Sequence, residues 1–461
     1  MGKHLSSNEG RMTSDRLVND DRSCVWHPFT QMRDWCDQEP LIIASGKGAV
    51  LCDVHGREYI DGVASIWTNV HGHCRDEIDH AIRDQLSKVA HTTLLGLANV
   101  PSIELAARLV DITPTGLSKV FYSDNGSTAV EVACKMAFQY WRQKPDPRPE
   151  KTRFISFTNG YHGDTIGAVS LGGIDLFHSI FGPLLFETYQ AHYPYCYRCR
   201  YDKTYPACSL HCLRSLEELL SEKHDQVAAI VIEPMVQGAG GMIVAPPEFL
   251  KRVRELATQY NVLLIADEVA TGFGRTGRMF ACEHAGVSPD LMALGKGITG
   301  GYLPLAATLA TDEVYSAFLG DYSAQKTFFH GHTYTGNPLA CAAAIASIDL
   351  FGKDGVLAHV ARKADLLAQK LRAVAQLDHV GDIRQLGLMV GIELVRDKRT
   401  REPYAWEERI GIRTITEARS RSVILRPLGN VIVLMPPLCI TEEQISTLVE
   451  VTAASIQAAT A

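Results

Sequence analysis

Two residues that are able to act together in catalysis follow neighbouring apolar stretches. Asp267 comes directly after residues 261–266, a short and mostly apolar run that is typical of a buried strand. A further apolar stretch leads to Lys296, which lies between Gly295 and Gly297. In α/β proteins, ligands bind at the carboxyl ends of such strands. The sequence therefore predicts that this carboxylate and this amine face one crevice.

A carboxylate and an amine in one crevice are the two groups that pyridoxal 5'-phosphate (PLP) needs. The lysine amine forms a Schiff base with the cofactor aldehyde, and the carboxylate holds the pyridine nitrogen protonated, so that the ring withdraws electrons. Taken singly, Asp267 and Lys296 would be read as a solvated acid and an ordinary loop lysine. The flanking segments GFGRTG and GKGITGG favour the PLP interpretation. We therefore predict that both residues are catalytic and bind the cofactor.

Two further strand ends carry side chains suited to the same cofactor. Residues 119–124 read as a strand, and Gly126 and Ser127 follow it at the start of a helical segment. A helix start offers N–H groups to a phosphate, although serine also caps helices that bind nothing. After a strand at residues 153–157, Tyr161 lies in a glycine-rich turn. There it is able either to stack on a flat ring or to fill the core.

The rest of the chain reads as an α/β protein with a smaller α+β part. Strand, helix and strand follow one another between residues 227 and 266, which predicts a parallel sheet. After residue 350 the pattern changes to helices and short strands, with Arg426 in a turn between two strands. We expect four segments: a mobile tail (1–22), the N-terminal segment of a small domain (23–75), a large PLP-binding domain (76–349) and a C-terminal small domain (350–461).

The composition is that of a globular enzyme. Of the 461 residues, 46% are apolar and 21% are charged. The net charge of -7, without any basic run, argues against nucleic-acid binding. No apolar run reaches the length of about 18 residues that a membrane span needs, and the beginning of the chain lacks the apolar core of a signal peptide. Twelve scattered cysteines are typical of reduced thiols. We therefore predict a cytoplasmic protein that binds neither nucleic acid nor membrane.

Four of the cysteines lie close together in the sequence. Their spacing, C-x2-C-x8-C-x3-C, resembles that of a small structural zinc loop, and His211 is a further candidate ligand. The alternative is a surface loop with free thiols. The four residues are Cys196, Cys199, Cys208 and Cys212. We assign no metal to the catalytic site, and the sequence leaves the zinc question open.

Together these segments resemble the class III aminotransferases. The similarity covers nearly the whole chain from Trp26 onward and includes, in this order, WHPFTQM, SDNGSTAVEVA, NGYHGDTIGAVS, DEVATGFGRTG, ALGKGITGGYLP, HGHTYTGNPLACAAA and RPLGNVIVLMPP. It implies the type I aminotransferase fold, PLP as cofactor, small-molecule substrates and a homodimer. Within the family, the segments are most similar to members that convert 8-amino-7-oxononanoate to 7,8-diaminononanoate in biotin biosynthesis.

The resemblance implies roles for residues that contact the cofactor. Lys296 matches the Schiff-base lysine, Asp267 the partner of the pyridine nitrogen, and Tyr161 the catalytic-site residue that stacks on the ring and borders the substrate. Glu233 matches an acid near the cofactor. The phosphate-binding positions are matched by Gly126 and Ser127 and, from the other subunit of a dimer, by His332 and Thr333.

The resemblance also implies a substrate pocket. Its residues would be Phe29, Trp67, Tyr161, Gly331, Lys296 and Arg426, the last of which receives the substrate carboxylate. Many family members have tyrosine in place of Phe29 and two tryptophans in place of Ile66-Trp67. The usual amino donor of these enzymes is S-adenosyl-L-methionine, whereas a subgroup that uses lysine is similar to this chain at Phe29 and at residues 66–69. Loss of one indole removes stacking area that a sulfonium or an adenine would use.

Two alternative functions follow from the same residues. A class III ω-amino acid or diamine aminotransferase, or an aminomutase, would keep PLP and differ in the pocket residues Phe29, Trp67 and Arg426. A cofactor-free scaffold or nucleotide-binding protein would be colourless. No P-loop supports the latter, because Asp290 stands where the first glycine of that motif would precede Gly295.

Overall fold

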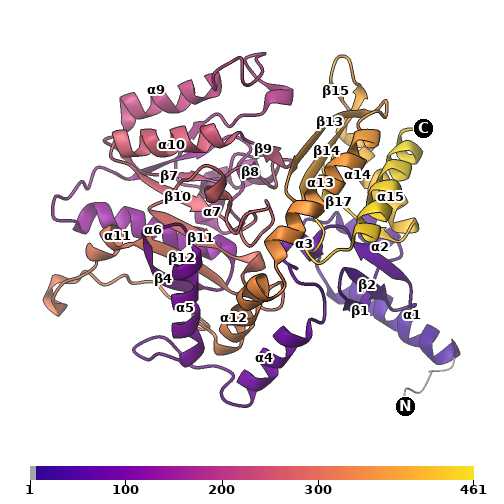
Figure 1. Cartoon of the computed structure of the whole chain (residues 1–461), viewed down its shortest axis with the longest axis horizontal. Helices are drawn as coiled ribbons and strands as arrows, with labels where there is room; N and C mark the ends of the chain where they lie inside the picture. The colour runs from indigo at the N-terminus through magenta and orange to yellow at the C-terminus, as the bar shows by residue number, and fades with distance from the viewer. Residues whose placement is uncertain (1–6) are drawn as a thin grey trace.

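A seven-stranded sheet lies at the centre of the structure, a computed structural model that describes residues 7–461 (Figure 1). The strand order is β4-β12-β11-β10-β7-β5-β6. Neighbouring strands are parallel except where β12 takes part, so β12 alone in this sheet runs against the others. The strands are β4 (Leu117–Ser123), β5 (Arg153–Phe157), β6 (Tyr189–Ala191), β7 (Val227–Ile232), β10 (Leu263–Asp267), β11 (Leu291–Leu294) and β12 (Ala306–Thr311).

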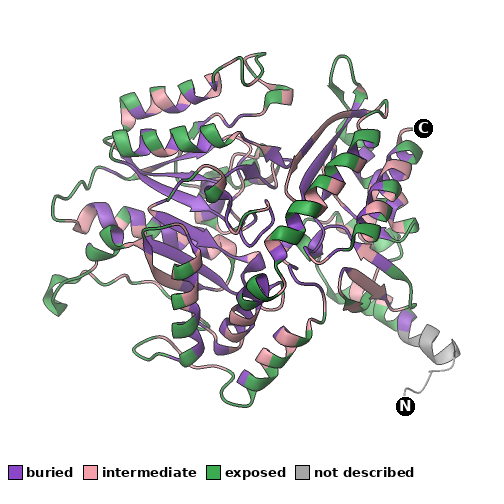
Figure 2. Ribbon diagram, in the orientation of Figure 1, coloured by how far each residue is buried: buried purple, intermediate pink, exposed green. Residues whose placement is uncertain are grey.

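Both faces of this sheet are buried, which explains why its strands are apolar along their whole length. In β7, Ile230 and Ile232 enter one hydrophobic core, whereas Ala229 and Val231 enter a second core on the opposite face. Figure 2 shows the buried strands between helices whose outer surfaces are exposed. The helices of this part include α4 (Asp76–Leu86), α5 (Val100–Ile112), α6 (Gly126–Gln143), α9 (Arg214–Lys223), α10 (Pro247–Gln259) and α12 (Pro338–Lys353).

Parallel strands deliver the residues that follow them to one edge of the sheet. Asp267 is the last residue of β10, and Lys296 comes directly after the end of β11. Glu233 follows β7, while Ser127 and Tyr161 follow β4 and β5. Because these five strands point the same way, residues from five distant stretches of the chain reach the same side of the molecule.

Two smaller sheets form the second part of the fold. One has the order β13-β14-β18-β17, and the other has the order β1-β2-β3-β16. In the second sheet β16 pairs in parallel with β3, so a segment near the C-terminus extends a sheet begun near the N-terminus. The strands are β1 (Ile43–Lys47), β2 (Val50–Asp53), β3 (Glu58–Asp61), β13 (Val380–Leu386), β14 (Met389–Asp397), β15 (Glu402–Pro403), β16 (Val423–Ile424), β17 (Arg426–Leu428) and β18 (Val431–Leu434).

Three helices cover these smaller sheets. They are α13 (Val356–Val374), α14 (Ile410–Ser420) and α15 (Glu442–Thr460), which appear in orange and yellow in Figure 1. The predicted fold class, a mostly parallel α/β sheet with a smaller α+β part built from both chain ends, is thereby confirmed. The boundaries of the four predicted segments stay predictions.

One local expectation needs correction. Arg426 does not lie in a turn: it begins β17 and pairs with Val433 of β18.

The predicted mobile tail falls partly within the described residues. Residues 7–22 belong to helix α1 (Ser7–Cys24), while residues 1–6 lie outside the described part of the chain. The mobility of this segment stays a prediction. Within residues 7–461, none of the helices combines the length and apolar character that a membrane crossing requires.

Candidate functional site

The edge of the sheet where the parallel strands end opens into a cavity of about 700 Å³. The structure brings together the predicted cofactor acid and lysine there, together with most of the other residues singled out in the sequence. Those that line the cavity are Trp67, Gly126, Ser127, Tyr161, Glu233, Asp267 and Lys296. The shared crevice expected for Asp267 and Lys296 is therefore present, and the chemical roles of the lining residues stay predictions.

Lys296 begins the short 3-10 helix η5 (Lys296–Thr299) directly after β11. Its φ of 43° is in the left-handed region, which is uncommon for a side-chain-bearing residue and often marks a functional site. The Lys296 Nζ lies 5.3 Å from the ring centre of Trp67. Removal from water lowers the pKa of Lys296, although the charges of Asp267 and Glu233 act against this. The environment therefore favours the neutral amine, which is the nucleophilic and basic form.

Asp267 is oriented by a histidine that the sequence analysis did not single out. His162 Nδ1 lies 2.7 Å from Asp267 Oδ2, and both side chains are buried. Burial by itself would lower the pKa of His162, but the hydrogen bond and charge of Asp267 raise it overall. Asp267 Oδ1 accepts a hydrogen bond of 3.1 Å from the Val269 N–H. A signal was available, because His162 directly follows Tyr161 in the glycine-rich turn after β5.

The N-terminus of α6 is capped by residues other than Ser127. The Asn125 side chain accepts a hydrogen bond from the Thr128 N–H, and the Asn125 N–H donates to the Thr128 hydroxyl. Ser127 Oγ instead lies 2.7 Å from Thr165 Oγ1 and accepts from the Thr165 N–H. The alternative that Ser127 is an ordinary N-cap is therefore wrong, and its hydroxyl lines the cavity beside the first turn of a long helix.

Two glycines let neighbouring backbone approach this helix start. A methyl group at Gly163, whose φ is +121°, would lie 2.3 Å from Ser127 Oγ. A methyl group at Gly126 would lie 2.4 Å from Val269 Cγ1. Any larger residue would push apart the segments that enclose the first turn of α6. These glycines thus create the close backbone approach that a phosphate-binding helix N-terminus requires.

Glu233 lines the cavity and is hydrogen-bonded to two other segments of the chain. Its carboxylate accepts hydrogen bonds from the Tyr161 N–H (3.0 Å) and from the Gly238 N–H (2.9 Å). Burial raises the pKa of Glu233 to about 7, and the charge of Asp267 acts in the same direction while His162 opposes it. The Tyr161 hydroxyl donates to Asp164 Oδ2 at 2.8 Å. Burial, with Asp164 as its acceptor, raises the pKa of Tyr161, so the phenol stays protonated.

Trp67 is presented by a strained segment. Ala64, Ser65, Ile66 and Trp67 all have positive φ values between 47° and 69°, which forms one left-handed turn within α3 (Ala64–Trp67). Such a turn is unfavourable for L-residues and persists when the surroundings enforce it. Arg275, which is fully buried, helps to enforce it by donating to the carbonyls of Asn69 and Pro436. The Trp67 indole is buried, and its Nε1 has no hydrogen-bond partner among the described residues.

Phe29 and Arg426 lie beside the cavity but do not line it. The Phe29 ring is 5.4 Å from Phe177, in α8 (Asp175–His178), and the Phe177 ring is 6.4 Å from Tyr161. Phe177 is thus an intervening aromatic residue that sequence reasoning missed. Burial lowers the pKa of Arg426, whereas the nearby Tyr161 acts against this. Phe29 is therefore linked to Tyr161 through Phe177, and Arg426 is near enough to Tyr161 for the phenol to affect its pKa.

Gly331, His332 and Thr333 are also absent from the lining of the cavity. They belong to the loop that precedes α12, and His332 Nδ1 lies 3.0 Å from Asp124 Oδ2. Asp124 does line the cavity, next to the start of α6. Exposed apolar side chains surround this loop, namely Leu95, Leu97, Phe329 and Tyr334.

The four cysteines of the possible zinc loop line a separate cavity of about 200 Å³. All twelve cysteines are free thiols. Within residues 7–461, no group of three or more histidine, cysteine, aspartate or glutamate side chains is arranged to hold a metal ion. Whether this loop binds zinc or carries free thiols stays an open prediction. The same loop carries Tyr195 and Arg198, whose contacts are described below.

The lining of the main cavity fits a phosphorylated pyridine aldehyde. Ser127 and the first turn of α6 are suited to a phosphate, and glycines at 126 and 163 let neighbouring segments approach this turn closely. Across the cavity, the oriented carboxylate of Asp267 is suited to a ring nitrogen, and the Lys296 amine is suited to an aldehyde. All three groups belong to one cavity.

Comparison with known proteins agrees with this geometry. Residues 32–456 match the family described as "Aminotransferase class-III". The chain is 60% identical over 431 residues to the adenosylmethionine-8-amino-7-oxononanoate aminotransferase of Geobacter sulfurreducens, covering 93% of this chain and 95% of that protein.

Solved structures are similarly close. The crystal structure of adenosylmethionine-8-amino-7-oxononanoate aminotransferase from Methanocaldococcus jannaschii has a TM-score of 0.92 and 46% identity, covering 96% of this chain and 99% of that chain. An amine transaminase from an uncultivated Pseudomonas species, in a PLP-bound form, has a TM-score of 0.90 and 39% identity, covering 94% of this chain and 98% of that chain.

Proposed function

The chain belongs to the class III aminotransferases, and on this premise we propose that it transfers an amino group to 8-amino-7-oxononanoate, giving 7,8-diaminononanoate for biotin biosynthesis. As a family member it is a PLP-dependent aminotransferase. The single observation that carries the proposal is the joint presence, in one cavity, of the Lys296 amine, the oriented Asp267 carboxylate and the glycine-lined start of α6. Relatives with this acceptor in their names support the choice of substrate.

PLP, when bound, supplies an aldehyde carbon that takes up amino groups and a ring that delocalises electrons from the carbon being deprotonated. Lys296 is the residue that would hold this aldehyde covalently. When it is not bound to the aldehyde, Lys296 Nζ would remove the proton from the substrate carbon that bears the amino group. The same amine would hold that proton and release it again, so it would act as general base and then as general acid. The lowered pKa of Lys296 suits this role, because the neutral amine is the base.

Asp267 and His162 would act at the pyridine nitrogen of the cofactor. Asp267 would accept a hydrogen bond from the protonated pyridine nitrogen and stabilise its positive charge. His162 fixes the orientation of the carboxylate through the 2.7 Å contact with Oδ2 and holds it in a dry environment. Ser127 and the first-turn N–H groups of α6 would bind the phosphate, assisted by the dipole of an 18-residue helix.

The substrate would lie toward Tyr161 and Arg426. We propose that Arg426 binds the carboxylate of the oxononanoate bidentately, since a guanidinium presents two parallel N–H donors. The protonated Tyr161 hydroxyl, Trp67 and Phe29 would line the path between that carboxylate and Lys296. Arg426→Ala is expected to weaken binding of the oxononanoate, and an unchanged apparent affinity would place the carboxylate elsewhere.

The amino donor is S-adenosyl-L-methionine or lysine. The names of the relatives favour the former. The departure at Phe29 and the single indole at Trp67 favour the latter, because the site then has less aromatic area for a sulfonium or an adenine. Single-turnover conversion to the pyridoxamine form with each donor in turn discriminates between them.

We further propose a cytoplasmic homodimer in which Gly331, His332 and Thr333 complete the partner's site. Support comes from the exposed apolar side chains around this loop, Leu95, Leu97, Phe329 and Tyr334, which a second subunit would cover. The cytoplasmic location is supported by the twelve free thiols.

The decisive test is Lys296→Ala, read by borohydride reduction and peptide mapping. Wild-type protein should carry the reduced cofactor on Lys296, and the variant should be inactive and unlabelled. A label on another lysine, or an active yellow variant, would refute the assignment. Failure of active wild-type enzyme to convert 8-amino-7-oxononanoate with either donor would leave an ω-amino acid or diamine aminotransferase, an activity close to that of the Pseudomonas neighbour.

A further inference from the structure

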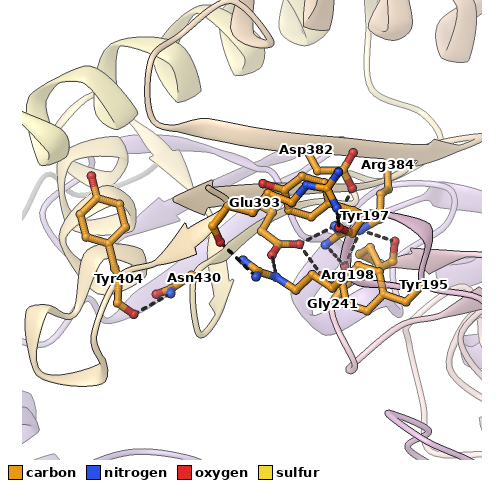
Figure 3. A network of polar contacts seen from close by, with 11 residues as sticks. Tyr195, Tyr197, Arg198, Gly241, Asp382, Arg384, Glu393, Tyr404 and Asn430 are labelled. Atoms are coloured by element: carbon orange, nitrogen blue, oxygen red, sulfur yellow. Dashed lines mark hydrogen bonds and ion pairs between the residues drawn. The ribbon is translucent and has the colours of Figure 1, made fainter. Parts of the chain in front are cut away.

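A buried ion pair joins the two strands of one hairpin in the smaller part of the fold. Arg384 of β13 donates from Nη1 to Glu393 of β14 at 2.6 Å, and both side chains are at most 8% exposed (Figure 3). The same Nη1 donates to Asp382 at 2.8 Å. Since a buried charge is costly unless it is paired and hydrogen-bonded, this pair must be well satisfied to persist.

The remaining donors of Arg384 satisfy carbonyls in a different part of the fold. Nη2 donates to the Gly241 carbonyl at 2.7 Å, and Nε donates to the carbonyls of Gly241 and Met242 at 3.2 and 3.3 Å. These two residues belong to the turn that joins β8 (Val236–Gln237) and β9 (Ile243–Val244). A methyl group at Gly391 of β14 would lie 2.8 Å from the Gly241 carbonyl. The hairpin therefore approaches this turn at backbone distance.

The turn that Arg384 holds contacts residues that line the main cavity, although it does not line the cavity itself. Its first residue, Gly238, donates its N–H to Glu233, which in turn accepts from the Tyr161 N–H. A methyl group at Gly238 would lie 3.1 Å from the Trp67 ring, and one at Gly240 would lie 2.4 Å from the Asn159 carbonyl. Any shift of the turn would therefore be transmitted to Tyr161 and Trp67.

The cysteine-containing loop also contacts the Arg384–Glu393 pair. Tyr195 and Arg198, at η2 (Cys196–Arg198), both donate to the Glu393 carboxylate. The Arg384 guanidinium also lies 5.1 Å from the centre of the Tyr195 ring. With five partners around one carboxylate–guanidinium pair, namely Asp382, the carbonyls of Gly241 and Met242, Tyr195 and Arg198, the groups have little freedom to adopt another arrangement.

The sheet that carries this pair also carries Arg426. Gly391 of β14 pairs with Val433 of β18, and Val433 pairs with Arg426 of β17. Arg426 is therefore two strands away from β14 in the same hydrogen-bonded sheet. A displacement of the hairpin relative to the turn would move Arg426 relative to Tyr161 and Lys296.

We propose that Arg384 and Glu393 are positioning residues that set the distance between the carboxylate-binding Arg426 and the reactive Lys296. They do so by fastening the β13-β14-β18-β17 sheet to the Gly238–Met242 turn. The inference rests on the proposed function, because it needs a substrate whose carboxylate binds Arg426. A rearrangement of about 1 Å between the two ends of the site costs up to about a hundredfold in rate. This loss of rate should affect substrates that contact both Arg426 and Lys296.

The test compares an acceptor with a carboxylate and one without. Arg384→Met removes the donors to the turn, while Arg384→Lys keeps a charge that is unable to reach Glu393 and two carbonyls together. Holoenzyme of each variant, in the pyridoxamine form, is assayed with 8-amino-7-oxononanoate and with butanal. We expect kcat/KM for the oxononanoate to fall about tenfold or more and kcat/KM for butanal to change less than about threefold. Arg384→Lys keeps the test valid if Arg384→Met folds poorly.

Two comparisons separate positioning from general damage. Arg396→Met, on the same strand β14, breaks an exposed ion pair with Glu408 and should change neither acceptor. In an Arg426→Ala background, Arg384→Met should add no further loss for the oxononanoate, since the carboxylate contact is already absent. Equal losses for the two acceptors, or additive losses in the double variant, would overturn the inference. Wild-type enzyme that accepts butanal but not the oxononanoate would instead refute the proposed substrate.

Discussion

At the scale of single residues, the cavity holds groups whose environments move their protonation in opposite directions. Lys296 has a lowered pKa because it is removed from water, whereas burial raises the pKa of Glu233 to about 7. Divergent pKa values within one site are typical of acid–base chemistry. His162 and Asp267 form a third kind of group, a buried pair in which Asp267 raises the pKa of His162 against the effect of burial.

His162 should affect the chemical step more than substrate binding. His162→Phe keeps a ring of similar size but leaves Asp267 Oδ2 without its buried partner. A hydrogen bond to a charged group contributes about 1.5–3 kcal/mol, which corresponds to a loss of roughly tenfold to a hundredfold in kcat. Single-turnover kinetics of the donor half-reaction measure this.

A buried histidine elsewhere provides the control for this variant. His71 contacts the carbonyl of Ser347 and does not contact Asp267, so His71→Phe should leave kcat nearly unchanged. A His162→Phe enzyme with normal single-turnover rates would contradict the orienting role.

The raised pKa of Glu233 predicts a pH-dependent contribution to the stability of the cofactor-free protein. Its folded pKa of about 7 is above the ordinary value of 4.5, so the folded state binds a proton more tightly than the unfolded state. This stabilisation is fully present below pH 4.5 and is lost as the pH rises through 7. The loss is about 3 kcal/mol.

Urea unfolding of the wild type and of Glu233→Gln between pH 5 and pH 8 measures this effect. The slope of unfolding free energy against pH should differ, since glutamine has no proton to lose. Identical slopes for the two proteins would show that Glu233 does not titrate in this window.

At the scale of elements, the surroundings of the start of α6 depend on Gly163, a neighbouring residue without a side chain. The cap is provided by Asn125 and Thr128, so the Ser127 hydroxyl does not cap the helix and instead contacts Thr165. Gly163 passes within contact of Ser127 because it has no side chain. The proposed phosphate site therefore depends on the pair of segments rather than on the helix alone.

Gly163→Ala should weaken cofactor binding at this element. The added methyl group would meet Ser127 Oγ at 2.3 Å and push the two segments apart, so the PLP dissociation constant should rise at least about tenfold. Absorbance or fluorescence titration of the cofactor-free protein measures the constant.

Gly116 provides a matched control, since its φ is also positive, at +104°, and nothing lies within 4 Å of an added methyl group. Gly116→Ala carries the backbone strain of about 1–2 kcal/mol without the steric clash. It should lower stability and leave PLP affinity unchanged. Similar PLP affinities for the two alanine variants would contradict the inference that the close approach of Gly163 to Ser127 shapes the phosphate site.

At the scale of the whole molecule, residues 331–333 are the predicted site residues that suggest a contribution from a second subunit. These residues do not line their own chain's cavity, and apolar side chains such as Leu95 and Phe329 are exposed around them. A second subunit docked there would cover this apolar surface and receive Thr333 at its phosphate site. The homodimer is therefore part of the proposed catalytic arrangement.

Subunit mixing tests this arrangement. Lys296→Ala and Thr333→Ala homodimers should each have low activity. If Thr333 acts in the partner's site, a mixed dimer contains one site with both Lys296 and the partner's Thr333. Refolding the two variants together in equal amounts should then recover about a quarter of wild-type activity, from the half of the dimers that are mixed. If Thr333 acts within its own chain, each mixed dimer contains no additional intact site and the activity should not exceed the average of the two variants.

The sequence by itself determined the strands and the residues at their ends. Apolar runs such as β7 and β10 are set by local composition, and the residues that follow them reach one edge wherever the strands are parallel. Asp267, Lys296, Ser127 and Tyr161 were therefore recognisable from pattern alone. Their grouping in one cavity required only that these strands share a sheet.

Contacts between distant segments were decided by the tertiary structure. His162 meets Asp267 because β5 and β10, which β7 separates, end at the same edge of the sheet. Arg275 reaches two carbonyls in separate loops, and Arg384 contacts the Gly238–Met242 turn because its hairpin packs on that turn. A local pattern describes which face a residue occupies and not which partner meets it there. Burial then changes the behaviour of the side chain, since a group such as Glu233 acquires its raised pKa only when the folded chain excludes water around it.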